Sequence, residues 1–133
     1  MRYRLTPDAD ADIAHVLRQT RKLFGKPQVS IYADIIDRGI AMVAEDPSRP
    51  VCAERNEIRP GVKSFHLELV KRRRHSASHL LYFMEAKAAD GATEIVVIGV
   101  VHENMEPKRK LSRVLRVVDS EGAVDEKPQT VPR

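Results

Sequence analysis

Hydrophobic residues recur every three to four positions in the first part of the chain, after a short stretch in which Tyr and Leu alternate with Arg. Thr6 can cap a helix with its hydroxyl, Pro7 suits the first helical position, and Gly25 suits the residue just past the end. The pattern predicts a strand over residues 2–5 and then an amphipathic helix, with Ile13, Val16, Leu17, Leu23 and Phe24 on its apolar face.

A second helical pattern begins at Pro27 and stops at Asp46-Pro47. Its short link to the first helix predicts an antiparallel helical hairpin. Gly39 costs about 1 kcal/mol relative to Ala inside a helix, which indicates a close approach to the other helix. Residues 47–57 are expected to form a loop. The apolar face of the second helix consists of Val29, Tyr32, Ala33, Ile36, Ile40 and Val43.

The period changes from helical to two after Pro60-Gly61, which predicts a three-stranded antiparallel meander. Its strands are expected near residues 63–69, 79–86 and 94–101, with a turn at residues 89–91. The last strand is apolar on both sides, as central strands are. A hairpin centred near Arg74 and His75 would place Phe65, Leu67, Leu69, Leu80, Tyr82 and Met84 against the helices, and Ser64, His66, Glu68, His79 and Glu85 on the other face.

Two histidines are expected to meet at one edge of this sheet. The meander brings His102 beside His79, next to the basic turn of residues 71–75. The same register puts His66 four residues away, about 13 Å at roughly 3.3 Å per residue, too far for direct acid-base pairing. Solvated polar side chains at strand ends are the alternative for all three. For the basic turn, the alternatives are an anion-binding loop and a solvated loop whose charge discourages aggregation.

The end of the chain combines a short apolar pattern with a polar tail. Leu111, Val114, Leu115 and Val118 could form a short helix, and disorder is expected from Asp119 onward. The sequence therefore predicts one domain over residues 1–111 and a C-terminal extension over residues 112–133.

Composition adds a basic surface but no cofactor chemistry. The net charge is +4, with a pI near 9.4, which favours a polyanionic or acidic partner as much as a small basic domain without one. The lone Cys52 excludes an internal disulfide framework and a Cys-based zinc site, and it favours a reducing compartment such as the cytoplasm. The chain has no apolar leader and no apolar run long enough to span a bilayer, so no membrane partner is expected. No glycine-rich phosphate loop, HExxH or nucleophile elbow occurs, so no cofactor and no metal are expected.

Four segments of the chain resemble one known family. YRLTPDADADI, EIRPGVKSFHL, HLLYF and VIGVVHENMEPKRKL are similar to the ParE/RelE superfamily of type II toxin-antitoxin toxins, and specifically to its ParE-like branch. The resemblance covers about residues 2–111. It implies an α+β fold of order β-α-α-β-β-β, with the helical hairpin packed on a small antiparallel sheet, and a bacterial toxin encoded beside a ParD-like antitoxin.

The resemblance also implies candidate binding residues. ParE-like toxins usually bind and poison DNA gyrase without catalysis of their own, and their antitoxin folds across the helical hairpin and sheet edge. The candidates for target binding are Arg59, Lys63, Arg72, Arg73, Arg74, His102, Met105, Lys108 and Arg109. The candidates for antitoxin binding are Ile13, Leu17, Tyr32, Ile36 and Arg73.

Two alternatives stay open at this point. A RelE-like toxin would cleave mRNA on the ribosome, with Arg72 to Arg74, His79, Tyr82 and His102 stabilising charge and transferring protons; only in that case, or through the target, would nucleic acid be a partner. The third possibility is an antitoxin-binding module that is not toxic. These functions share a fold, so the fold cannot choose among them.

Overall fold

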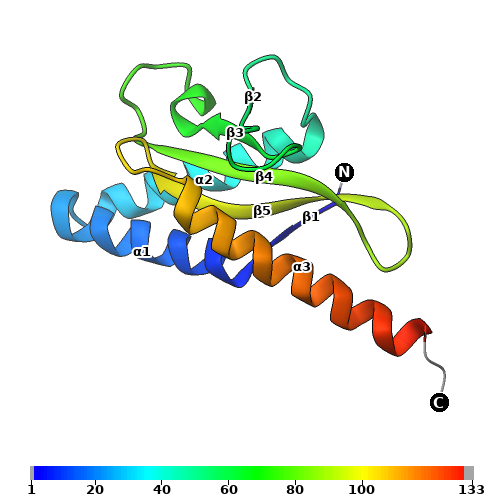
Figure 1. Ribbon diagram of the computed structural model, residues 1–133. Coiled ribbons are helices and arrows are strands. Elements are labelled where there is room, and N and C mark those ends of the chain that lie inside the picture. The colour runs from blue at the N-terminus through cyan, green and yellow to red at the C-terminus, as the bar shows by residue number, and fades with distance from the viewer. Residues whose placement is uncertain (1, 131–133) are drawn as a thin grey trace.

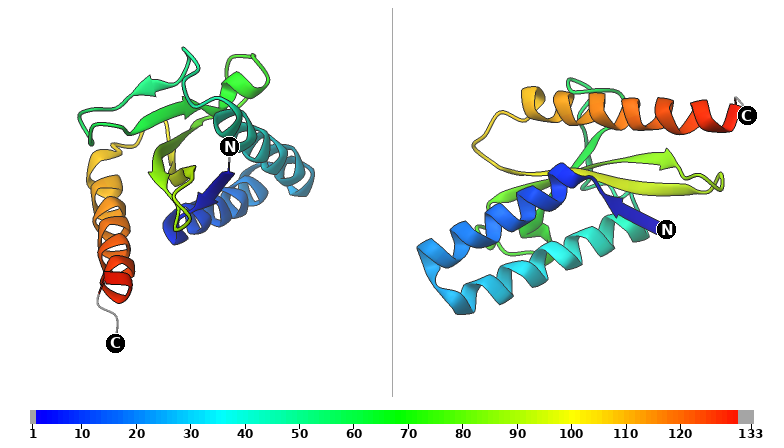
Figure 2. Two further views of the ribbon diagram at one scale, coloured as in Figure 1. Left: turned by 90° about the vertical axis from the view of Figure 1, so that its right-hand side faces the viewer. Right: turned by 90° about the horizontal axis from the view of Figure 1, so that it is seen from below.

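A five-stranded mixed sheet lies between two helical layers (Figures 1 and 2). The computed structural model describes residues 2–130, and for residues 121–130 the backbone only. The strand order is β1-β5-β4-β3-β2, in which β1 runs parallel to β5 and the other neighbours are antiparallel. The elements are β1 (Arg2–Leu5), α1 (Pro7–Phe24), α2 (Lys26–Glu45), β2 (Ala53–Glu54), β3 (Lys63–His66), the 3-10 helix η1 (Leu67–Val70), β4 (His79–Lys87), β5 (Thr93–His102) and α3 (Lys108–Thr130).

The α+β class, the helical hairpin and its end signals are confirmed. The Thr6 hydroxyl accepts a hydrogen bond from the Ala9 N–H at 3.0 Å, so it caps α1 as predicted. Gly25 separates α1 from α2 with a φ of 91°, a conformation that glycine adopts without strain. Asp46 ends α2. The expected loop of residues 47–57 differs in one detail, because the short strand β2 adds an edge to the sheet there.

The predicted strand over residues 63–69 is shorter in the structure. β3 ends at His66, and the chain continues as η1, in which Leu67 and Val70 are buried. Gly39 explains this packing: a Cβ at that position would lie 2.5 Å from Leu67 Cδ2. The close approach predicted for Gly39 therefore exists, but its partner is η1 and not the other helix.

The predicted register of the β3/β4 hairpin is wrong. Phe65 pairs with Leu81 and His66 with Leu80, so Leu81 and Phe83 join Phe65 in the core against α1 and α2. Leu80, Tyr82 and Met84 belong to a second core against α3. The alternation rule failed because β4 is apolar on both faces, and only the presence of α3 decides which set faces which helix.

Helix α3 is longer than the short helix predicted from Leu111 to Val118. It begins at Lys108 and continues to Thr130, over most of the stretch expected to be disordered. Leu111, Val114 and Leu115 are buried against the sheet, whereas the later part extends past the domain (Figure 1). The domain boundary near residue 111 stays a prediction, and residues 131–133 lie outside the described part. None of the described helices is long and apolar enough to cross a membrane.

Candidate functional site: a histidine groove

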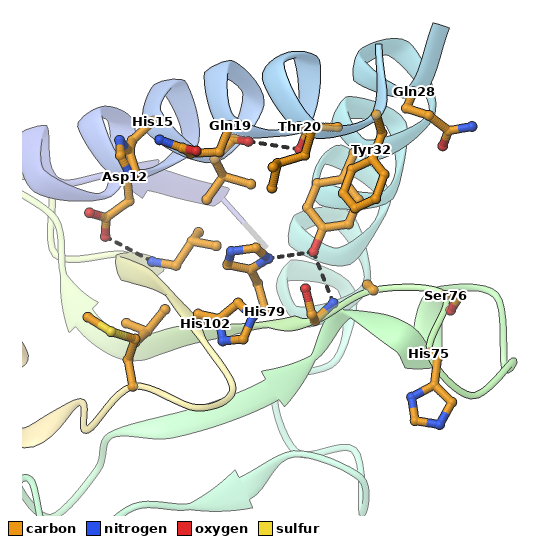
Figure 3. A pocket seen from close by; sticks show the side chains of 18 of the residues that line it. Asp12, His15, Gln19, Thr20, Gln28, Tyr32, His75, Ser76, His79 and His102 are labelled. Carbon is orange, nitrogen blue, oxygen red and sulfur yellow. Dashed lines mark hydrogen bonds between the residues drawn. The ribbon is translucent and has the colours of Figure 1, made fainter. Parts of the chain in front are cut away.

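A groove with a volume of about 630 Å³ opens where the α1/α2 hairpin meets the ends of β4 and β5 (Figure 3). We call it the histidine groove, because His79 and His102 lie in it beside Tyr32. Its wall from α1 and α2 is formed by Asp12, His15, Val16, Gln19, Thr20, Leu23, Phe24, Gln28 and Tyr32. The opposite wall comes from the ends of β4 and β5, the segment before β4, the segment after β5 and the start of α3. It is formed by His75, Ser76, Ala77, Ser78, His79, Val100, Val101, His102, Met105 and Lys110.

His79 and His102 meet as the sequence predicts. They are the first residue of β4 and the last of β5, they pair directly across the two strands, and their rings make an edge-to-face contact with centroids 5.2 Å apart. The predicted separation of His66 is wrong. His66 pairs with Leu80, only one register position from His79.

Tyr32 holds the His79 ring from α2. The Tyr32 hydroxyl oxygen lies 2.6 Å from His79 Nδ1 and accepts a hydrogen bond from the Ser78 N–H at 3.2 Å. Because the hydroxyl oxygen already accepts the Ser78 N–H, we assign the hydroxyl as the donor and His79 Nδ1 as the acceptor of the bond between them. With this assignment His79 is the neutral tautomer that carries its proton on Nε2.

The groove keeps both of these groups uncharged. Burial, and to a smaller extent the neighbouring His102, lower the pKa of His79 to about 4. Burial also raises the pKa of the Tyr32 hydroxyl above its usual range. At neutral pH the pair is therefore a phenol bonded to an uncharged imidazole.

His102 is fixed as the same tautomer by its own loop. The Asn104 N–H donates to His102 Nδ1 at 3.1 Å, so in the neutral ring the proton is on Nε2. Neither His79 nor His102 therefore offers a free ring lone pair in this arrangement.

An ion pair forms one end of the groove. Lys110 of α3 bonds to Asp12 of α1, whose other carboxylate oxygen accepts the Val100 N–H at 3.1 Å. Gly99 makes room for this junction, because a Cβ there would lie 2.8 Å from Leu111 Cδ2 and 3.3 Å from Asp12 Oδ2. Asp12 thus links α1, β5 and α3, and it neutralises the Lys110 ammonium group.

The structure separates the third member of the predicted catalytic set from the other two. Tyr82 belongs to the core beneath α3, on the other face of the sheet from His79. It is 3% exposed, and its hydroxyl accepts from Arg55, whose guanidinium also stacks over the ring at 5.2 Å. His79, Tyr82 and His102 therefore do not form one site.

The predicted target-binding residues lie in several places. Arg59 is paired with Asp119 of α3 at 2.7 Å, and Lys63 donates to the Pro47 carbonyl oxygen. His102 and Met105 line the histidine groove. Arg72, Arg73 and Arg74 are exposed in the basic turn, and Lys108 and Arg109 are exposed in the first turn of α3.

The predicted antitoxin-binding residues are mostly part of the core. Ile36 is buried, and Ile13 and Leu17 are partly buried against the same cluster. Tyr32 is the member that reaches the groove. Sequence reasoning missed Leu23 and Phe24, which it assigned to the core and which are 67% and 70% exposed at the end of α1. Their position next to Gly25, at the tip of the hairpin, was the available signal.

Comparison with known proteins finds a protein of similar sequence. The chain is similar to the Escherichia coli protein named toxin ParE, with 28% identity over 116 residues, which are 86% of this chain and 96% of that protein. The predicted resemblance to ParE-like toxins is confirmed. No family model matches the chain.

Proposed function

We propose that this ParE-like protein is the toxin of a toxin-antitoxin system, that it inhibits DNA gyrase by binding, and that a cognate antitoxin neutralises it. The similarity to a toxin over nearly the whole length supports the general part. One observation supports binding over catalysis: Tyr82 lies on the opposite face of the sheet from His79 and His102. A ribonuclease mechanism that needs all three at one phosphate has no common site.

Neither His79 nor His102 is a free general base. Both ring Nδ1 atoms are occupied, by Tyr32 and by the Asn104 N–H, and His79 stays neutral down to a pH near 4. A general base needs an available lone pair and a pKa near the working pH. The arrangement instead resembles a recognition surface, with a polar floor and an exposed apolar rim.

The exposed apolar rim supports an antitoxin that covers the hairpin. Leu23 and Phe24 on α1 and Met105 after β5 expose large apolar side chains that line the groove. Clustered exposed apolar side chains of this kind are typical of protein interaction sites. An amphipathic antitoxin segment that folds on binding would bury them.

The decisive experiment assays both toxin mechanisms with one purified protein. Gyrase on supercoiled DNA is tested for trapped cleavage, and translating ribosomes are tested for cuts in mRNA. We expect gyrase inhibition that persists in His79→Phe with His102→Leu, because neither ring acts chemically. mRNA cleavage that this double variant abolishes, with gyrase unaffected, would overturn the proposal in favour of the RelE-like alternative.

Neutralisation is tested by co-expression. Growth arrest on induction should be relieved by the protein encoded next to the toxin gene. If neither gyrase nor ribosomes are affected and growth continues, the protein is a non-toxic antitoxin-binding module. Leu23→Ser with Phe24→Ser should keep toxicity and lose the relief, because these side chains belong to the rim and not to the core.

A further inference from the structure

In three of the five histidines ring Nδ1 has a hydrogen-bond partner, and in one of these three Nε2 has a partner as well. His66 Nδ1 accepts the Glu68 N–H at 3.1 Å, while its Nε2 lies 2.8 Å from the Glu103 carboxylate oxygen. Since Nδ1 is an acceptor, Nε2 is the donor to Glu103. The hydrogen bond from His66 in turn lowers the pKa of the Glu103 carboxyl. The protein thus uses a ring fixed at Nδ1 to bind a carboxylate at Nε2.

His79 and His102 have the same arrangement without the carboxylate. Their Nδ1 atoms are occupied, and no described residue accepts a hydrogen bond from either Nε2. Among the described residues, no fully buried side-chain nitrogen or oxygen lacks a hydrogen-bond partner, so both Nε2–H groups reach solvent. Both rings line the histidine groove. The groove therefore presents two fixed donors that have no acceptor among the described residues.

The charge of the groove favours one carboxylate over a chain of phosphates. Lys110 is already neutralised by Asp12, and His79 is uncharged at neutral pH, so the floor offers hydrogen-bond donors more than net positive charge. A nucleic-acid backbone gains affinity by displacing counterions with several cations. The rim, with Leu23, Phe24 and Met105 each more than half exposed, instead matches apolar side chains.

No described side chain of α3 supplies the acceptor. That helix starts beside the groove at Lys110 and runs away from the tip of the α1/α2 hairpin, so its far end leaves the groove open (Figures 1 and 2). Glu103, the nearest acidic residue after His102, is paired with His66. The described residues thus leave both donors without an acceptor, and the exposed apolar rim matches a segment in which an acidic residue lies between apolar ones.

We propose that the Nε2–H groups of His79 and His102 form a carboxylate subsite that binds an Asp or Glu side chain of the antitoxin, whose apolar neighbours pack on Leu23 and Phe24. Tyr32 and Asn104 act as positioning residues, because they fix the two tautomers. The identity of the partner rests on the proposed function. The carboxylate chemistry of the subsite does not.

The subsite is tested first with small probes on the full-length protein. Acetyl-Leu-Glu-Leu-amide, its Gln counterpart and inorganic phosphate are titrated while the ¹⁵N signals of the histidine rings are followed by NMR. We expect the Glu peptide to shift the Nε2 signals of His79 and His102 and to bind at least about tenfold more tightly than the Gln peptide, the lower range for a hydrogen bond to a charged group. Equal binding of the two peptides, no detectable shift, or a preference for phosphate would overturn the subsite.

Matched variants separate the subsite from general destabilisation. His102→Leu should abolish the preference for Glu over Gln, and His102→Gln, which keeps an N–H donor, should retain part of it. His66→Gln is the control, because His66 already has Glu103 as its partner and should leave the preference unchanged. Circular dichroism verifies that each variant is folded. A preference that survives His102→Leu combined with His79→Phe contradicts the proposal.

Binding measurements with the antitoxin separate a failure of the carboxylate subsite from a failure of the proposed function. Each acidic residue of the protein encoded beside the toxin gene is changed to its amide and combined with His102→Leu in a double-mutant cycle. One acidic residue should couple with His102 by about tenfold in Kd. A complex without any such coupling would overturn the subsite and leave the proposed function intact. Binding of the Glu peptide without any complex between the toxin and the antitoxin would support the subsite and overturn the proposed function.

Discussion

A tyrosine hydroxyl takes part in a hydrogen-bond network on each side of β4. In one network each named group has a partner within the chain, whereas in the other one nitrogen has no partner among the described residues. Beneath α3, the Tyr82 hydroxyl accepts from Arg55, which also bonds to Ser64 and Glu57. Beside the α1/α2 hairpin, Tyr32 holds His79, whose far nitrogen has no acceptor among the described residues. The first network ends at a partner within the chain, the Glu57 carboxylate, whereas the second ends at a groove.

The difference comes from what covers each face. Helix α3 buries Leu111, Val114 and Leu115 over the Tyr82 side, so a polar group there must be satisfied internally. No described element covers the histidine groove, so polar groups there can be satisfied by a partner. Polar residues beneath α3 should thus affect stability alone, whereas those in the groove should affect recognition as well.

The largest effect is expected from weakening the packing of α3 on the sheet. Leu111→Ala deletes a fully buried side chain that packs α3 on the sheet, and it should lower the free energy of unfolding by about 2–5 kcal/mol in urea titration. Val117→Ala, at a half-exposed position of the same helix, is the control and should change it by less than about 0.5 kcal/mol. Similar losses from both variants would mean that α3 does not close this face.

The two tyrosines provide a matched pair. Tyr32→Phe leaves the partly buried Ser78 N–H and His79 Nδ1 without their partner, at a cost of about 1–3 kcal/mol. Tyr82→Phe should cost about 1 kcal/mol, because Arg55 keeps Glu57 and Ser64. Binding of the Glu peptide should weaken only in Tyr32→Phe, as the ¹⁵N signals of the His79 ring change tautomer. Weakened binding in Tyr82→Phe would break the contrast between the faces.

Acid should destabilise the groove before it affects the face beneath α3. His79 has a pKa of about 4 when folded and an ordinary value near 6.5 when unfolded, so the unfolded state binds more protons between these pH values. Its contribution to stability is full above about pH 6.5 and is lost as the pH falls toward 4. The slope is at most about 1.4 kcal/mol per pH unit, and smaller here because the ring is partly exposed to solvent that screens it.

Comparison of urea titrations at pH 7 and pH 5 measures this loss. His79→Phe should reduce the difference between the two titrations, whereas His66→Gln should retain most of it. An unchanged pH dependence in His79→Phe would show that the histidine is not the titrating group.

The smallest effect is expected in the basic turn. Arg73→Ala changes an exposed side chain and should alter stability by less than about 0.5 kcal/mol. If the turn contributes to binding of an acidic partner, the loss in affinity should shrink as salt rises, since exposed charges are screened. A salt-independent loss would indicate a specific contact instead. The His102→Leu effect on the Glu peptide should persist better at high salt.

The sequence predicted the hairpin well because its signals are local. Thr6, Gly25 and Asp46 act within a few residues, and the helical period is long enough to be unambiguous. The meeting of His79 and His102 was also predictable, because an antiparallel meander fixes which strand ends adjoin. These features need no knowledge of distant packing.

The rest depended on contacts across the fold. Alternation could not decide which face of β4 meets α1 and α2, since both faces are apolar and α3 was expected to be much shorter. The position of Tyr82 failed for the same reason. The hydrogen bond from Tyr32 to His79 joins residues 47 positions apart, and no local pattern indicates it. The exposed Leu23 and Phe24 had the spacing of core residues, but the sheet does not extend far enough to cover them.

Gly99 gives this architecture a signature that could be read in the sequences of relatives. Leu111 of α3 and Asp12 of α1 both approach the place where its Cβ would lie. A larger residue at position 99 would have to be accompanied by a smaller one at position 111, and loss of the Asp12 carboxylate by loss of the Lys110 charge. Joint exchange at these four positions would mark the relatives in which α1, β5 and α3 meet in the same way.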